Sequence, residues 1–154
     1  MTHPFSKEKI EFKVSADKNI ASNLALMKLV YPAEGYDRNY YQWQYFNNPA
    51  GPARIFILEY ESVTMGLFCL IPFDFLGNNA MYKLWRIQDV MMHPDLRGLK
   101  LFAALNDFAL SHESFCETDL FLGLPNQSSH KTFQNYHFTT YSPIPIWKAA
   151  GKES

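Results

Sequence analysis

The sequence is poor in the features that mark several classes of protein. It has only two cysteines, Cys69 and Cys116, among 154 residues. They are too far apart to form a close metal-binding pair, and isolated cysteines are typical of a reducing compartment. Residues 1–15 alternate charged and apolar side chains without a continuous apolar stretch, so they predict neither a signal peptide nor a membrane-spanning helix. We therefore expect a cytoplasmic protein with no membrane partner and no bound metal.

The charge is low and evenly spread along the chain. Lys and Arg total 14 against 15 for Asp and Glu, which gives a net charge of -1. Because nucleic-acid binding relies on clustered positive charge, this balance argues against such a partner. The sequence also contains neither a glycine-rich phosphate loop of the P-loop type nor a Gly-x-Ser-x-Gly elbow. Nucleotide hydrolysis and serine-based hydrolysis are therefore not indicated.

The apolar residues are numerous enough, and regular enough, to predict one folded domain over residues 1–154. They make up 47% of the chain, which suffices for a core of ordinary size. Three consecutive β-rich runs joined by short turns predict an antiparallel meander, and a helix after them predicts a parallel return strand. We expect an α/β (α+β) fold with a mixed, mostly antiparallel sheet, with strands over residues 9–15, 54–60, 64–72, 81–92 and 117–124 and helices over residues 17–31, 36–46 and 99–112.

The junction after residue 92 has the properties of an anion-binding site. An apolar strand ends there in a turn containing Pro94 and Gly98, and a helix begins near Leu99. The first amides of a helix have no intrahelical partner and carry the positive end of the helix dipole. Gly98 allows close approach of the backbone, and Arg97 adds a forked cation suited to phosphate. The junction therefore predicts a phosphate-binding turn.

This junction resembles the cofactor motif of the GNAT superfamily, acyltransferases that use acetyl-CoA. The motif is a strand followed by Val-x-Pro-x-x-[Arg/Gln]-x-x-Gly-x-[Gly/Ala], and the match runs from Met92 to Phe102. Lys100 stands where the family usually has Gly, and Phe102 where it usually has Gly or Ala. A second stretch, from Asn126 to Phe138, is similar to the family's Asn-x-x-Ala-x-x-x-Tyr-x-x-x-Gly-Phe. With the predicted meander, the resemblance covers essentially the whole chain.

The resemblance implies a GNAT fold and an N-acetyltransferase that moves an acetyl group from acetyl-CoA to a primary amine of a small molecule, for example an amino sugar. It implies that backbone groups of the strand pair with the pantetheine arm and that the following turn holds the pyrophosphate. Asn126 is expected to contact the pantetheine arm, and capping of the following helix is an equally good interpretation of it. The other implied cofactor contacts are Val90, Met91, Met92, Arg97, Gly98, Leu99, Lys100, Leu101 and Phe102.

The acid and base that such a reaction needs are less well matched. The family's acidic Tyr falls at Phe133, which has no proton to donate. Tyr136 is the candidate replacement, and a half-buried aromatic role is its alternative. Asp89, in the strand before the turn, is the candidate base. Its alternative is a structural Asp at a solvent-facing or bulged position, bonded to a backbone amide.

Aromatic side chains are concentrated between residues 40 and 46. They either pack against the sheet, as most aromatic residues do, or line a pocket for the acceptor. In the second interpretation, which the resemblance favours, Tyr40, Trp43 and Tyr45 bind the substrate.

A second hypothesis of function belongs to a different class. Phe133 in place of the acid, Lys100 in the turn and the short C-terminal segment are also compatible with a GNAT-fold module that binds acyl-CoA or a protein partner without catalysis. The expected sheet has room for one strand after residue 139, and an uncovered edge there would allow a homodimer.

Overall fold

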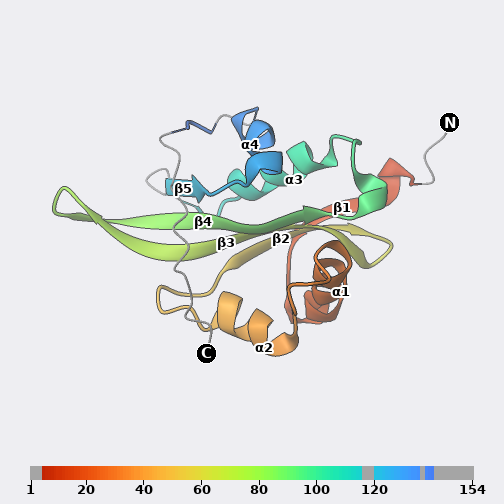
Figure 1. Cartoon of the computed structure of the whole chain (residues 1–154), viewed down its shortest axis with the longest axis horizontal. Helices are drawn as coiled ribbons and strands as arrows, with labels where there is room; N and C mark the ends of the chain where they lie inside the picture. The colour runs from red at the N-terminus through yellow and green to blue at the C-terminus, as the bar shows by residue number, and fades with distance from the viewer. Residues whose placement is uncertain (1–4, 116–119, 136–137, 141–154) are drawn as a thin grey trace, which may run out of the picture. The chain divides into compact units, whose positions relative to one another are not determined.

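A computed structural model describes residues 5–115, 120–135 and 138–140 (Figure 1). The chain divides into two compact units, Met1–Leu124 and Pro125–Ser154. The first unit contains the sheet and most of the helices. The second contains the helix α4 (Gln127–Gln134). The two units are described separately below.

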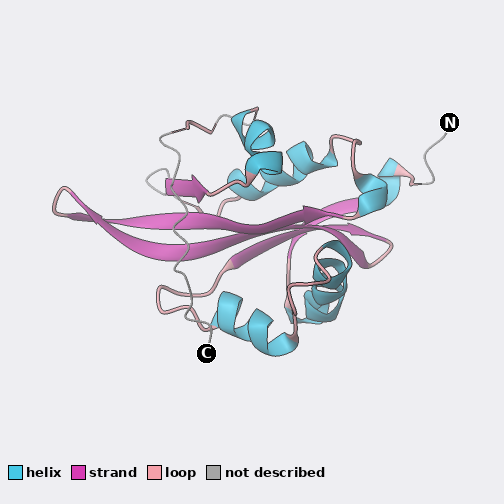
Figure 2. Cartoon of the chain, viewed as in Figure 1, coloured by secondary structure: helices cyan, strands magenta, loops and turns pink. Residues whose placement is uncertain are grey.

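A five-stranded sheet forms the centre of the first unit (Figure 2). The strands lie side by side in chain order, and all neighbours are antiparallel except β4 and β5, which are parallel. The mixed, mostly antiparallel sheet predicted from the sequence is therefore confirmed. The strands are β1 (Ile10–Val14), β2 (Arg54–Tyr60), β3 (Val63–Gly77), β4 (Ala80–Met92) and β5 (Leu120–Gly123).

Helices cover both faces of this sheet. Figure 1 shows α1 (Ile20–Val30) and α2 (Arg38–Tyr41) on one face and α3 (Leu101–Leu110) on the other. α2 continues directly into a π-helical turn, Gln42–Phe46. The side chain of Asp37 caps α2 by accepting a hydrogen bond from the Tyr40 amide at 2.7 Å. This cap fixes where the aromatic segment starts, and therefore which of its rings face the sheet.

The core on the α1 and α2 face combines alternate strand residues with one side of each helix. In a strand every second side chain points to the same face, and Leu67, Cys69 and Ile71 of β3 follow this rule. They pack with Met27 of α1 and with Tyr45. The aromatic segment therefore contributes to the core, as one of the two interpretations of the sequence expected.

The hairpin of β3 and β4 is longer than the sequence indicates. The predicted strand ends at Pro72, whereas β3 continues to Gly77 and pairs with β4 up to the turn at Asn78 and Asn79. β2 pairs with β3 only as far as Leu70. Beyond that point β3 pairs only with β4 within the described part of the chain, and an edge of this kind is where a sheet tolerates proline.

Two other expectations are only partly tested. The predicted strand over residues 117–124 is present as β5, and residues 117–119 lie outside the described part of the chain. The strand expected after residue 139 also falls almost entirely outside it. None of the described helices has the length and apolar content that a membrane crossing requires.

Candidate active site

A β-bulge in β4 places Asp89 on the face that α1 and α2 cover. Leu67 pairs with Met91 and Cys69 pairs with Gln88. Phe68 of β3 is therefore opposite two residues of β4, Asp89 and Val90, which defines a bulge. Asp89 has a φ of 48°, a left-handed conformation that costs most side chains free energy and that Asp tolerates better than most. The bulge interrupts the alternation of the strand and redirects the carboxylate.

Two tyrosine hydroxyls hold the Asp89 carboxylate. Tyr36, in the loop before α2, donates to Oδ1 at 3.1 Å, and Tyr45, in the π-helical turn, donates to Oδ2 at 2.5 Å. Both tyrosines are buried. A carboxylate offers about four lone-pair positions, so these two bonds leave room for a further donor. The structure thus confirms the bulged position that the structural alternative for Asp89 expected, while the side-chain bonds come from two tyrosine hydroxyls rather than from a backbone amide.

The surroundings of Asp89 keep its neighbours protonated. Burial raises the pKa of Tyr36 and of Tyr45 above the usual 10.0, and the negative charge of Asp89 raises both further. Burial likewise raises the pKa of the Cys69 thiol, and Asp89 adds to the effect. These groups therefore remain hydrogen-bond donors near neutral pH, and the Asp89 carboxylate is the acceptor among them.

The three predicted substrate-binding aromatics occupy different environments. Tyr45 is fully buried, so the structure corrects its expected role as a pocket wall: its hydroxyl reaches Asp89 because the π-helical turn directs it into the core. Tyr40 is half-buried and contacts both Tyr36 and Trp43. Burial and the Asp89 charge raise the pKa of Tyr40 to about 12, although the positive charge of Arg86 opposes this. Trp43 is 65% exposed.

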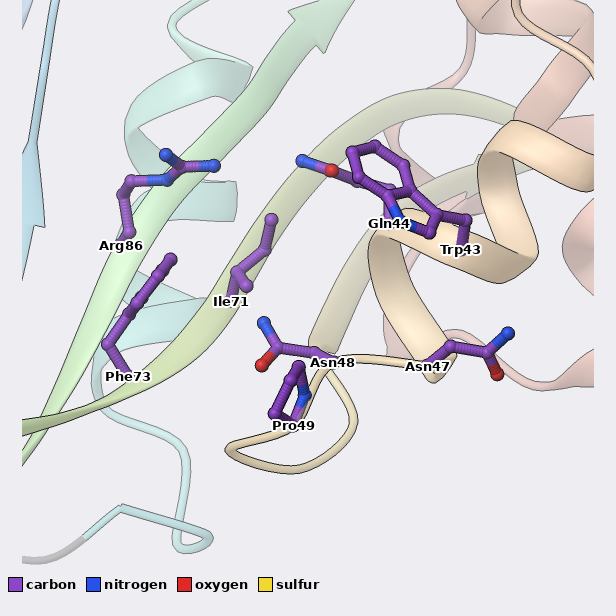
Figure 3. A pocket seen from close by; sticks show the side chains of 8 residues that line it. All are labelled: Trp43, Gln44, Asn47, Asn48, Pro49, Ile71, Phe73 and Arg86. Carbon is purple, nitrogen blue, oxygen red and sulfur yellow. The ribbon is translucent and has the colours of Figure 1, made fainter.

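Trp43 lines a pocket of about 250 Å³ beside this cluster. Figure 3 shows the pocket between the hairpin of β3 and β4 and the segment that runs from Trp43 to Pro49. Such a volume suits a small polar molecule better than a large ligand. Its lining residues are Trp43, Gln44, Asn47, Asn48, Pro49, Ile71, Phe73 and Arg86.

The second half of β4 has one free edge. β5 pairs with β4 only from Leu84 to Ile87, whereas β4 continues to Met92. Among the described residues, no strand pairs with Val90, Met91 or Met92 on that edge. Backbone groups on an unpaired edge can accept an added strand-like partner.

The turn after β4 lies where the sequence predicts one, between the end of β4 and the start of α3. A short 3₁₀ helix, Pro94–Leu96, leads to Gly98 with a φ of 82° and to Lys100 with a φ of 62°. Lys100 occupies the N-cap position of α3, and its side chain makes no capping bond. Arg97 is exposed and its Nε donates to the Met92 carbonyl at 3.4 Å. Leu99, Leu101 and Phe102, the remaining predicted contacts, are each partly exposed around this turn.

The second unit contains the remaining candidates. Asn126 is the N-cap of α4, and its side chain accepts from the Ser129 amide at 2.9 Å. The capping interpretation of Asn126 is therefore confirmed. Phe133 is buried and packs against Phe138 with ring centroids 5.3 Å apart. Tyr136 lies outside the described residues.

Sequence reasoning missed Tyr36 and Arg86. Arg86 had a usable signal, because it interrupts a mostly apolar strand three residues before Asp89. Tyr36 had none, since its bond to Asp89 spans 53 positions of the sequence. Within the described ranges, no group of three or more His, Cys, Asp or Glu side chains is arranged to hold a metal ion.

The mostly antiparallel five-stranded sheet with flanking helices matches the GNAT fold of solved acetyltransferase structures. No protein-family model and no curated protein matches the sequence. An acetyltransferase of Trypanosoma brucei superposes with a TM-score of 0.69 at 15% identity, covering 91% of this chain and 99% of that one. The GNAT resemblance noted from the motifs is therefore confirmed at the level of the fold.

Two further structures extend the comparison. A protein from Clostridium acetobutylicum, described as a predicted acetyltransferase and solved with acetyl-CoA, matches with a TM-score of 0.70 at 13% identity, covering 90% of this chain and 96% of that one. Glucosamine-6-phosphate N-acetyltransferase from Arabidopsis thaliana matches with a TM-score of 0.65 at 14% identity, covering 91% and 97%. At such identities the likeness establishes the fold and not the reaction.

Proposed function

We propose that the chain is an N-acetyltransferase that moves an acetyl group from acetyl-CoA to a primary amine of a small molecule. The observation that carries the proposal is the end of β4. Its unpaired edge, Val90 to Met92, leads without interruption into the turn with Gly98 and Lys100. A ligand whose extended arm binds along this edge would thus place its anionic group at the turn.

The chain's residues fit acetyl-CoA in two respects. The backbone of Val90 to Met92 offers strand-like hydrogen bonds to the pantetheine arm. The turn offers Arg97, the backbone at the left-handed Gly98 and the start of α3 to the pyrophosphate. Bound acetyl-CoA supplies the thioester, whose carbonyl carbon forms the new bond to nitrogen as its bond to sulfur breaks.

Asp89 is the proposed base. The amine acceptor arrives protonated at neutral pH and must lose a proton before it can attack. The Asp89 carboxylate has unused lone pairs and lies in the same neighbourhood as Tyr40, whose pKa it raises. Tyr36 and Tyr45 fix the orientation of the carboxylate, so they are positioning residues. Tyr136 remains the proposed acid for the leaving thiolate.

The acceptor enters from the side of Trp43. The pocket that Trp43 lines faces the same side of the sheet as Asp89 and is large enough for an amino sugar or a comparable amine. Amines of this kind are the proposed substrates.

Calorimetric titration with acetyl-CoA tests the proposal. We expect saturable binding at micromolar strength in the wild type and binding weaker by about 10-fold in Arg97→Ala, as for one lost charge-assisted contact. Arg54→Ala, which removes another exposed cation, at the start of β2, serves as the control and should bind as the wild type does. Amine-dependent release of free CoA thiol then tests turnover.

The catalytically inactive module predicts a different result. The observation that favours it is Phe133, which is buried against Phe138 at the position of the family's acid. An inactive module binds acetyl-CoA but releases no CoA with any amine. Absence of binding at millimolar acetyl-CoA would overturn both forms of the proposal and leave a protein partner as the ligand to seek.

A further inference from the structure

The pocket beside Trp43 contains one charged side chain. Of the 8 residues that line it, seven are uncharged and only Arg86 is ionisable. In Figure 3 the Arg86 guanidinium and the amides of Gln44 and Asn48 extend into the same space, whereas the Asn47 amide points away from it. A small volume lined by one cation and two amides selects for polarity and charge.

The positive charge of Arg86 has no counterpart in the described part of the chain. Its Nε is buried and makes no hydrogen bond there, and none of the ion pairs among these residues includes it. The guanidinium carbon lies 5.3 Å from the centre of the Phe73 ring, which holds the side chain in place. Buried polar atoms are almost always hydrogen-bonded in proteins, so an unsatisfied one at a pocket calls for a ligand or a water.

Lys83 shows that a lack of partners is not a general property of the cations on β4. It lies three residues before Arg86 on β4 and donates to Asp74 at 2.5 Å and to the Ala50 carbonyl at 3.3 Å. The two cations thus share a strand and differ in their partners. Arg86 is positioned but unpaired, which is the condition expected of a residue that binds an anion from outside the chain.

We propose that this pocket binds an oxyanion of the acceptor, so that the acceptor is a small amine that also carries a phosphate or a carboxylate. The planar guanidinium matches two oxygens of either group. The exposed ring of Trp43 offers a flat apolar surface for the body of the molecule. This inference rests on the proposed acetyltransfer and specifies its substrate class.

The spacing of Arg86 and Asp89 restricts the acceptor further. They are three residues apart on one strand, so their Cα atoms are separated by at most about 10 Å. Tyr40 lies within the electrostatic influence of both charges. An acceptor that meets both groups has its amine and its oxyanion several bonds apart. An amino-sugar phosphate or a long amino acid satisfies this spacing, whereas an amino acid with both groups on one carbon does not.

Matched pairs of acceptors test the proposal. The phosphate pair is glucosamine 6-phosphate and glucosamine, and the carboxylate pair is 6-aminohexanoate and hexylamine. We expect kcat/KM with acetyl-CoA to be about 10- to 100-fold higher for the charged member of at least one pair, the effect of one charge-assisted contact. The pair that shows the preference identifies the oxyanion.

Variants of the two cations make the test specific. Arg86→Gln should bring the ratio of kcat/KM between the charged and the uncharged member of the preferred pair close to one. Arg86→Lys should retain part of the preference, and Lys83→Gln should leave the ratio unchanged. Circular dichroism and thermal unfolding establish that each variant is folded. A wild-type ratio near one in both pairs overturns the proposal, as does a ratio that Arg86→Gln leaves intact or that Lys83→Gln reduces equally.

Direct binding separates this inference from the proposed function. If no amine releases CoA, the acetyltransferase proposal fails. Calorimetric titration with glucosamine 6-phosphate and with 6-aminohexanoate then tests whether the pocket binds an oxyanion. Binding of either compound that disappears in Arg86→Gln supports an oxyanion site. Absence of binding of both overturns it.

Discussion

The two halves of β4 differ in how completely they are paired. From Ala80 to Ile87 the strand follows an unbroken ladder with β3, and its last four residues also pair with β5. From Gln88 to Met92 it pairs only with β3 among the residues that the structure describes, and the bulge at Asp89 shifts its register. The first half is a regular strand throughout. The second half, five residues long, contains a bulge and lacks the pairing with β5.

The difference shows where this fold can place chemistry. A regular ladder alternates its side chains and so fixes their direction, and where it pairs on both sides, as from Leu84 to Ile87, it also uses its backbone groups internally. The second half leaves an edge for a ligand and turns a carboxylate toward Tyr36 and Tyr45. The charged residues of β4 do not all follow this division: Lys83 and Asp89 both have hydrogen-bond partners, whereas Arg86 has none among the described residues.

The largest expected effect comes from removing the charge at the bulge. Asn tolerates the left-handed conformation of Asp89 and has nearly the same shape, so Asp89→Asn should fold normally. We expect kcat for an acetylated amine to fall about 100- to 10,000-fold, the usual contribution of a general base. Asp107→Asn, an exposed carboxylate on α3, should have no effect. Turnover of Asp89→Asn within threefold of the wild type would show that the bulge has only a structural role.

A smaller effect is expected from the phenols around Asp89. In the unfolded chain tyrosine ionises near pH 10, and in the folded chain the pKa of Tyr40 is about 12 and those of Tyr36 and Tyr45 are also raised. As the pH rises, the tyrosines of the unfolded state therefore lose their protons first. The contribution of these phenols to the free energy of unfolding is fully present below pH 10 and decreases as the pH rises through 12. Urea unfolding at pH 8, 10 and 11 measures this decrease.

Tyr45→Phe tests how much of this loss of stability above pH 10 comes from Tyr45. The variant lacks the bond to Asp89, so it should lose about 1–2 kcal/mol at pH 8, and its stability should depend less on pH above 10. Each such phenol contributes a slope of up to about 1.4 kcal/mol per pH unit. Tyr31→Phe, at an exposed position after α1, is the control. An unchanged slope in Tyr45→Phe would mean that Tyr45 and Asp89 are not coupled as the structure places them.

The regular half of the molecule could be predicted from the sequence and the irregular half only in part. Alternation and turn residues were sufficient to pair β2, β3 and β4 in a meander and to expect a parallel strand after α3, because those signals are local. The bulge depends on how many residues of β4 oppose β3, which no local pattern records. Asp89 was therefore found as a candidate, while Tyr36 and the buried direction of Tyr45 were not.

Arg86 and the extension of β3 were missed for related reasons. A charged residue in a strand has no assigned role until its partners are known, and only the structure shows that Arg86 has no ion pair among the described residues. From the sequence alone, Pro72 indicates the end of a strand. β3 tolerates this proline because its pairing with β2 ends two residues earlier, at Leu70. Both features depend on which neighbours a residue has across the sheet.

The smallest expected effect concerns Lys100, which, like Asp89, has a left-handed backbone. The strain at Asp89 accompanies two hydrogen bonds to its side chain, whereas the Lys100 side chain makes no capping bond to α3. Lys100→Gly should therefore stabilise the protein by up to about 1 kcal/mol, since relief of strain exceeds the added freedom of the unfolded chain. Asp89→Gly should destabilise it, and Lys100→Ala, which keeps the strain and removes the charge, should change stability little. Urea unfolding at pH 7 compares the three variants, and a loss of stability in Lys100→Gly would show that this turn is held by contacts of the lysine side chain.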